Sequence, residues 1–303
     1  MSRRRKGRDV HGVILLDKPA GYSSSQAVQK IRWLFNARKA GHTGSLDPFA
    51  TGMLPICLGE ASKTAGFMLN AAKTYEATAL LGKASTTGDI EGEICREMTV
   101  PALDRHVVDA VLQEFLGDIE QVPPMYSALK HDGQRLYQLA RAGLQVERKA
   151  RAVKIFSLEL LGLDLPYMRF RVRCSKGTYV RTLAEDIAEK LGTCAHLHAL
   201  RRLQVEPFRA HDMMSLEQLA GLAENGDIDS CLLAVDAGLV EWPLLILDAA
   251  QTERFSHGNP VDAGAGKTGL VRVYGPENHL LGIGEVTREN LLQPKRLMNL
   301  PPQ

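Results

Sequence analysis

Two strand-like segments, AVKIFSLELLGL and MRFRVRCS, follow each other within residues 151–175 without a helical segment between them. Strand patterns also occur at 12–19 and 195–208, and helical patterns occur at 23–36 and 177–192. Strands and helices therefore do not alternate regularly, as they would in a parallel βαβ fold. This favours an α+β fold with a mixed, largely antiparallel sheet.

The pattern of the chain changes near residue 244. Residues 245–303 consist of short strand patterns separated by Gly, Pro and Asn, which predicts a small, separate β-rich module. For this 303-residue chain we therefore expect a basic tail over 1–10, a main domain over 11–244 and the module over 245–303.

Several classes of protein are disfavoured by simple features of the sequence. No apolar run approaches the roughly 18 residues that span a bilayer. The basic start MSRRRKGRDV lacks the apolar segment of a signal peptide. The five cysteines are odd in number and contain no C-x-x-C pair, which fits a reducing compartment. We expect a cytoplasmic protein with no membrane partner.

Positive charge gathers in two places, although the net charge is only +2. Residues 1–10 hold five Arg or Lys and one Asp, and residues 128–154 hold seven Arg or Lys and two acids. The second stretch is polar, follows a Pro-Pro turn and has few core residues, which predicts a long insertion containing a short helix. Either stretch is a footprint for a polyanion or a solvated basic face.

The loop GHTGSLDPFATG, residues 41–52, carries one acid, Asp47. Its glycines suit backbone turns or the close approach of another segment. Pro48 restricts Asp47 to extended or turn geometry. The carboxylate is therefore either an ordinary turn residue or a reactive group held on a stiff loop.

Four other polar or aromatic side chains occupy unusual positions: His42 in the same loop, Tyr75 at the start of a strand pattern, and Tyr179 and Arg181 where a helix begins. An arginine beside a buried aspartate would keep it ionised and lower its pKa. An ionised, poorly solvated carboxylate is a possible nucleophile. A structural ion pair is the alternative.

Other kinds of site have weaker signals. The segment AGAGKTGL, 263–270, ends like a phosphate-binding loop, but Val261 stands where that motif needs Gly. Cys194, His196 and His198 alternate, yet a fourth zinc ligand is missing, so we predict packing residues and no metal site. Glu185 and Asp186 lie on a predicted helix, where we interpret them as solvent-facing or capping charge.

The chain resembles a known family, the bacterial TruB-type pseudouridine synthases. The resemblance covers nearly the whole chain after residue 10. It rests on segments in matching order and spacing: GVILLDKPAGYSS, AGHTGSLDPFATGMLPICLGEASK, KTYEATALLG, STTGDIEG, VPPMYSALKHDGQRLYQLARAG, CSKGTYVRTLAEDIAEKLG and LRRLQVEPF.

The resemblance implies a pseudouridine synthase catalytic domain followed by a PUA domain. It implies conversion of uridine 55 in the T-loop of tRNA to pseudouridine, without cofactor or metal. Asp47 corresponds to the catalytic aspartate, Tyr75 to the active-site tyrosine and Arg181 to the arginine that pairs with the aspartate.

The remaining site residues are implied in the same way. His42 corresponds to the residue that fills the space left by the flipped nucleotide, Tyr179 and Leu200 to further pocket residues, and Lys18 to the lysine behind the site. The basic insertion at 128–154 is expected to close over RNA, with Lys130 and Arg141 among its contacts.

For partners, the resemblance implies tRNA, with the T-arm at the catalytic domain and the acceptor stem at the C-terminal domain. We expect a monomer. The alternative is an RNA-binding chaperone of tRNA folding, in which catalysis is secondary or absent. The complete set of Asp47, Tyr75 and Arg181 argues against a purely non-catalytic protein.

Overall fold

The computed structural model describes residues 7–127, 129–264 and 268–301. Its largest element is a sheet with the strand order β1-β3-β12-β4-β11-β10-β7 and β2 paired to β3. Among the described strands of this sheet, only β12 and β3 pair in parallel, so the predicted mixed, largely antiparallel sheet is confirmed. The bounds are Gly12–Lys18 (β1), Ala40–His42 (β2), Thr51–Leu58 (β3), Lys73–Leu81 (β4), Gly117–Gln121 (β7), Arg151–Asp164 (β10), Tyr167–Cys174 (β11) and Ala195–Val205 (β12).

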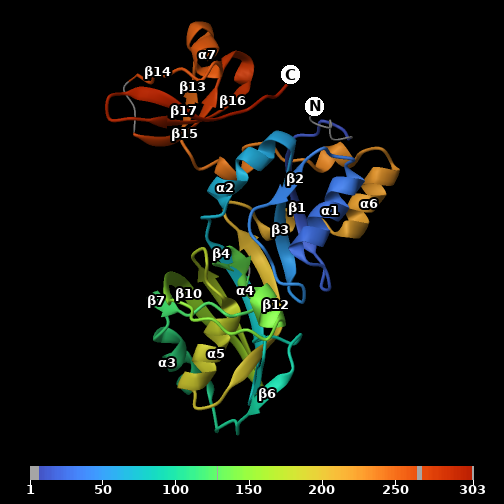
Figure 1. The fold of residues 1–303 in the computed structure, drawn as a ribbon, viewed down its shortest axis with the longest axis vertical. Helices are drawn as coiled ribbons and strands as arrows, with labels where there is room; N and C mark the ends of the chain where they lie inside the picture. The colour runs from blue at the N-terminus through green and yellow to red at the C-terminus, as the bar shows by residue number, and fades with distance from the viewer. Residues whose placement is uncertain (1–6, 128, 265–267, 302–303) are drawn as a thin grey trace.

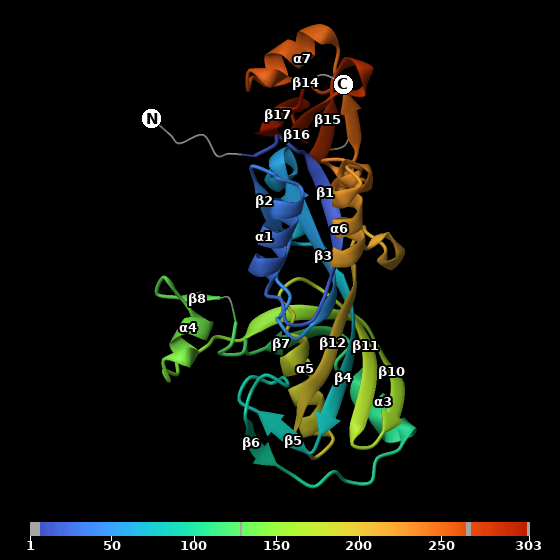
Figure 2. The same ribbon diagram turned by 90° about the vertical axis from the view of Figure 1, so that its right-hand side faces the viewer.

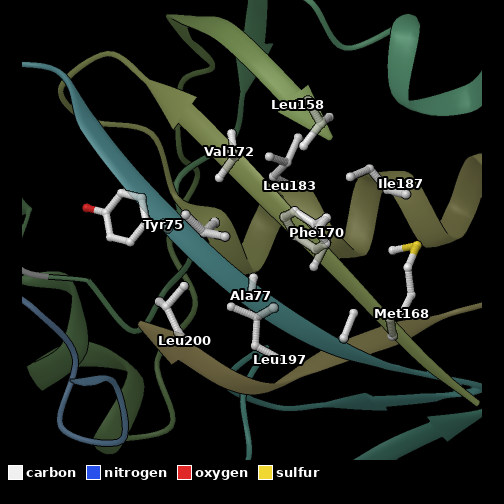
Figure 3. Packing of buried hydrophobic residues seen from close by; sticks show 14 of the residues in the cluster. Tyr75, Ala77, Leu158, Met168, Phe170, Val172, Leu183, Ile187, Leu197 and Leu200 are labelled. Atoms are coloured by element: carbon white, nitrogen blue, oxygen red, sulfur yellow. The ribbon is translucent and has the colours of Figure 1, made fainter. Parts of the chain in front are cut away.

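Helices cover the two ends of this long sheet separately (Figures 1 and 2). Near β1 and β3 lie α1 (Ser24–Leu34) and α6 (Leu216–Glu224), while α3 (Arg105–Gln113) and α5 (Val180–Lys190) pack near β10, β4 and β12. A capping box between Ser23 and Gln26 begins α1. Figure 3 shows Leu183 and Ile187 of α5 against Phe170 of β11, within the core that lies beneath the middle of the sheet.

The predicted basic insertion is a projecting segment with little core of its own (Figure 2). It contains β8 (Lys130–His131), β9 (Gln134–Arg135) and α4 (Leu136–Arg141), so the predicted short helix is confirmed; Ala128 lies outside the described residues. The predicted end at residue 154 is wrong, because Arg151–Lys154 already pair with β7 as the start of β10. Alternate burial of Val153 and Ile155 draws this part of the segment into the sheet.

The C-terminal β-rich module is a five-stranded sheet with the order β13-β15-β16-β17-β14. Its strands span Leu244–Ile246, Gly269–Tyr274, Leu280–Val286, Leu291–Leu297 and Val261–Asp262 in that order. The expectation of strands and turns alone is wrong at Ala249–Ser256, which forms helix α7. Asp248 caps its first turn in a capping box with Gln251, and Phe255 is fully buried beneath it.

The module packs directly on the main domain. Leu280 and Ile283 of β16 share an apolar cluster with Val13 and Met53 of β1 and β3. Beside this cluster, the buried carboxylate of Asp236 accepts hydrogen bonds from Arg272 at 3.0 Å and from the Tyr274 hydroxyl at 2.7 Å. The contact is therefore both apolar and charged.

Smaller elements complete the fold. They are α2 (Ala65–Met68), the hairpin of β5 (Lys83–Ser85) with β6 (Ile94–Glu97), and single 3₁₀ turns at Gly59–Lys63, Ala210–Asp212, Ile228–Cys231, Ala237–Leu239 and Pro276–Asn278. Within the described ranges, the helices are too short or too polar to cross a membrane.

Candidate active site

A cavity of about 260 Å³ opens at the middle of the large sheet. Five of the predicted site residues line it together: Asp47, Tyr75, Tyr179, Arg181 and Leu200. They come from the loop before β3, from β4, from the start of α5 and from β12. Residues that are more than 150 positions apart in the chain therefore meet in one cavity, because β3, β12 and β4 are neighbours in the sheet.

The Asp47 loop is anchored on both sides. The Ser24 hydroxyl donates to the Leu46 carbonyl at 2.9 Å and accepts from the Leu46 amide at 2.8 Å. The Lys18 ammonium donates to the Pro48 carbonyl at 3.2 Å. These contacts fix the backbone on either side of Asp47. The carboxylate is therefore held on an anchored loop.

Arg181 joins two carboxylates in this site. Its Nε lies 3.1 Å from Oδ2 of Asp47, and its Nη1 lies 3.1 Å from Oδ2 of Asp89. The same guanidinium donates to the carbonyls of Thr87 and Tyr126. Asp89 is buried with only 3% of its side chain exposed, whereas Asp47 keeps 38% exposed toward the cavity. Of the two, Asp47 is the carboxylate that a substrate can reach.

The charge state of Asp47 reflects opposing influences. Burial is the largest and raises the pKa of Asp47, the Arg181 guanidinium lowers it, and the Asp89 carboxylate raises it again. The predicted net lowering of this pKa by arginine is therefore wrong: desolvation outweighs the ion pair. The result is a poorly solvated carboxylate that is easier to protonate than an ordinary aspartate.

Aromatic and apolar side chains form part of the remaining wall, beside the cations Lys73, Lys176 and Arg202. Tyr75 is buried in β4, and burial is the main cause that raises the pKa of its hydroxyl. In Figure 3 the Tyr75 ring lies near the start of β4, apart from the core side chains Ala77 and Phe170. Tyr179 precedes α5, and its backbone exchanges two hydrogen bonds with the Gln121 amide. The aromatic part of the wall suits a flat heterocycle.

Two predicted site residues lie outside the lining of this cavity. His42 is in β2, where its Nδ1 accepts from the Gly44 amide at 3.2 Å, and burial lowers the pKa of its imidazole. Lys18 is fully buried and donates to the carbonyls of Pro19, Tyr22 and Pro48. Lys18 therefore supports the Asp47 loop from behind.

The remaining predicted contacts belong to the insertion. Lys130 lies in β8 and Arg141 ends α4, so both are part of the projecting segment. A second cavity, of about 530 Å³, separates this segment from the Asp47 loop and is lined by Asp47, Arg135, Tyr137 and Arg181. The insertion and the Asp47 loop thus share the walls of the second cavity.

Comparisons with known proteins agree with this arrangement. Residues 32–180 match the TruB family pseudouridylate synthase N-terminal domain, and 181–240 and 243–298 match two TruB C-terminal domain families. The chain is 51% identical over 299 residues to tRNA pseudouridine synthase B of Stutzerimonas stutzeri, covering 97% of this chain and 98% of the relative. The chain belongs to the TruB family of pseudouridine synthases. It is therefore an isomerase that acts on uridine in RNA.

Other relatives support the same membership. The tRNA pseudouridine synthase B of Pseudomonas fluorescens is 51% identical over 301 residues, which cover 97% of this chain and 98% of the relative. A crystal structure of a Cbf5–Nop10–Gar1 complex contains a chain with 25% sequence identity and a TM-score of 0.74, covering 94% of this chain and 84% of that one. The TruB fold therefore extends over almost the full length.

Two residues of this TruB site were missed by the sequence analysis. Asp89 carried no signal beyond its place in STTGDIEG. Arg202 is almost completely buried and donates to the carbonyls of Met53, Ser45 and Gly44, which holds the Asp47 loop against β12. Gly52 permits this approach, since a Cβ there would lie 2.2 Å from the Arg202 carbonyl oxygen. The sequence clue to this close contact was Gly52, one of the glycines of the Asp47 loop.

The structure also shows the surroundings of the two kinds of site that the sequence disfavoured, the carboxylate pair on α5 and the histidines of β12. Glu185 and Asp186 are half-buried rather than solvent-facing, and burial raises the pKa of Glu185 to about 7 and that of Asp186 to about 6. His196 Nδ1 lies 2.8 Å from the Lys83 carbonyl, and the exposed His198 ring contacts Tyr167. In the part of the chain that the structure describes, no group of His, Cys, Asp and Glu is arranged to hold a metal.

Proposed function

We propose that this TruB enzyme converts uridine 55 in the T-loop of tRNA to pseudouridine, with Asp47 as its catalytic aspartate and no cofactor or metal. The observation that carries the assignment is the Asp47 carboxylate, held 3.1 Å from Arg181 at the wall of a cavity that also contains Tyr75. The relatives with about half of their residues identical are tRNA pseudouridine synthases, which supports tRNA as the substrate.

The reaction breaks the bond between C1′ and N1, turns the uracil within the cavity and joins C5 to C1′. A proton leaves C5 and a proton is gained at N1, so the product is an isomer of the substrate. Asp47 acts on the reacting nucleoside in its ionised form, as a nucleophile or as a base that assists cleavage. Arg181 keeps the carboxylate oriented, and Tyr75 stacks against the uracil.

The target base must leave its stack before it can reach this cavity. Flipping a nucleotide costs a few kcal/mol, and stacking on an aromatic side chain returns about 1–3 kcal/mol per base. His42 fills the space that the flipped nucleotide leaves. The insertion, with Lys130 and Arg141, closes over the RNA backbone from the opposite side.

Beyond the T-arm, the C-terminal module acts as a PUA domain and contacts the acceptor stem. Residues 245–303 hold six Arg or Lys and six acids, so shape and local contacts contribute more than bulk charge. The enzyme works as a monomer in the cytoplasm, where its tRNA substrates are found. A tRNA-folding chaperone activity accompanies catalysis, since opening the T-loop is required for both.

Tritium release from tRNA labelled at uracil C5 tests the proposal. Wild-type protein should release tritium from uridine 55 alone, and Asp47→Asn should reduce the rate by roughly 10³-fold or more while RNA affinity changes only a few-fold. Binding without release by the wild type would overturn the enzyme assignment and favour the chaperone. Near-normal release by Asp47→Asn would remove Asp47 from the catalytic role.

A further inference from the structure

A buried lysine at the start of β4 lines the same cavity as the proposed catalytic residues. Lys73 is two residues before Tyr75, so both side chains lie on the buried face of the strand. Only 7% of Lys73 is exposed. The mechanism outlined above gives this ammonium no part, although burying a charge is costly unless it is paired or used.

Two backbone carbonyls hold the Lys73 ammonium in place. Its Nζ donates to the Leu69 carbonyl at 2.9 Å and to the Ala71 carbonyl at 2.7 Å, both in the turn that follows α2. An ammonium has three N–H donors. Within the described residues, these two bonds leave one donor of Lys73 for a ligand in the cavity.

The other buried cations that line the cavity are guanidinium groups held by several protein partners. Arg181 binds two carboxylates and two carbonyls, and Arg202 binds three carbonyls of the Asp47 loop and β3. Lys176 is exposed at the rim, where it donates to the Asn70 side chain. Among the described residues, Lys73 is therefore a buried ammonium of this cavity that keeps one donor for a ligand.

The proposed reaction creates a demand for such a cation. When the bond between C1′ and N1 breaks, its electron pair moves to the uracil, and the negative charge spreads over N1, O2 and O4. A fixed donor aimed at developing charge in a poorly solvated site is among the strongest devices of catalysis. The charge disappears again when C5 attacks C1′, so the donor need not transfer its proton.

We infer that Lys73 is a further catalytic residue of this enzyme, whose ammonium donates a hydrogen bond to a uracil carbonyl and stabilises the departing uracil anion. The inference rests on the proposed function, because it assigns a role within that reaction. This role also accounts for the position of Lys73 at the cavity wall, which its contacts with the turn after α2 alone do not require.

The electrostatic surroundings are consistent with this role. Burial is the main cause that lowers the pKa of Lys73 to about 8; Arg202 on β12 and Lys176 after β11 lower it further, and Cys174 on β11 raises it. The hydroxyl of Tyr75 and the carboxylate of Asp47 line the same cavity. The ammonium is therefore charged at neutral pH and loses its proton as the pH rises through about 8.

The test compares leaving groups of different stability. Single-turnover cleavage is measured at mildly acidic pH on tRNA transcribed with uridine or with 5-fluorouridine, because fluorine stabilises the uracil anion. Lys73→Met should slow the uridine reaction by about 10²-fold and the fluorinated reaction by less than about tenfold. Lys83→Met, at the exposed first residue of β5, is the matched control and should leave both rates within a few-fold of wild type.

Equal slowing on both RNAs would show that Lys73 only supports the turn after α2, and a uridine rate near wild type would remove it from the reaction; either overturns the inference. If Lys73→Met does not fold, Lys73→Arg decides. The wild-type rate should fall as the pH rises through about 8, and this fall should vanish in Lys73→Arg, whose charge persists. An identical fall in both proteins would overturn the inference. Wild-type protein without any pseudouridine product would instead reject the proposed function.

Discussion

At the scale of single residues, one guanidinium serves two carboxylates with different environments. Arg181 contacts Asp47 and Asp89 at the same distance, but only Asp47 faces the cavity. Arg181 therefore offsets part of the desolvation of Asp47, the proposed catalytic carboxylate, while Asp89 fixes the arginine. The balance between these three groups sets the pH at which Asp47 becomes protonated.

This balance predicts the acid limb of the pH–rate profile. The proposed mechanism uses ionised Asp47, and the pKa of Asp47 is raised, so the rate should decline at a higher pH than for an ordinary aspartate as the pH falls. Arg181→Met should move this limb to higher pH, because the guanidinium lowers the pKa of Asp47, whereas Arg181→Lys should move it less. Single-turnover rates across the pH range measure the limb. An unchanged limb in Arg181→Met would contradict the predicted coupling.

A second residue-scale prediction concerns Glu185. Its pKa is raised to about 7, so the folded protein binds a proton there more tightly than the unfolded chain. The stability that this proton contributes is present at low pH and is lost as the pH rises through about 7. Glu185→Gln should therefore melt near the wild-type temperature at about pH 5 and above it at about pH 8.

Thermal unfolding at the two pH values provides the measurement for Glu185→Gln. Glu253→Gln, at an exposed position of α7, is the control and should show no such pH-dependent difference. A melting temperature for Glu185→Gln that is displaced by the same amount at both pH values would show that Glu185 does not titrate in this range.

At the scale of elements, the insertion differs from every strand and helix around it. It reaches away from the sheet (Figure 2), and Leu136 at the start of α4 is one of its few buried apolar side chains. Few of its described side chains take part in a core, which is consistent with the proposed role of the segment at the RNA backbone. The neighbouring strand β10 begins where alternate burial resumes.

Replacement of residues 130–149 by a short Gly-Ser linker tests this role. Binding to tRNA should weaken, and the log–log dependence of affinity on salt should become shallower by about 0.7–0.9 for each phosphate that the segment neutralises in the wild type. The melting temperature should change little, because few core residues are removed. A salt slope equal to that of the wild type would show that the segment does not contact the backbone.

At the scale of the whole molecule, the C-terminal module and the main domain share a core. Leu280 and Ile283 pack with Val13 and Met53, and the Lys63 ammonium donates to the Leu297 carbonyl at 2.8 Å. Removing residues 245–303 would therefore expose apolar surface of the main domain as well as delete an RNA-binding module. A point substitution at the junction separates these effects better than truncation.

Arg272→Met is such a substitution. It leaves the buried carboxylate of Asp236 with only the Tyr274 hydroxyl as a side-chain partner, and loss of one member of a buried pair costs about 3 kcal/mol. The melting temperature should fall, while turnover of a minimal T-arm hairpin should persist. Combining it with Asp236→Asn should recover part of the stability, since no unpaired charge remains. A double variant less stable than the single one would contradict this account.

The sequence by itself determined the class of fold, most of its strands and the residues of the reactive loop. Local patterns decide these: alternate burial in β10 and β11, a serine cap before α1, and Pro48 next to Asp47. The resemblance to TruB enzymes followed from the same segments. Helix α7 was missed because its polar sequence, AAQTERFS, carries a weak apolar pattern and depends on the Asp248 cap and on burial of Phe255.

Only the tertiary structure decided which charges meet. Asp47 and Arg181 are 134 positions apart in the numbering, and their neighbours Asp89, Arg202 and Lys73 come from three further segments. Whether the pKa of a carboxylate is raised or lowered depends on the burial and on the charged partners that these segments supply together. Local sequence encodes strands and caps because those depend on near neighbours. Desolvation and long-range ion pairs depend on the assembled sheet, so they appear only once the chain has folded.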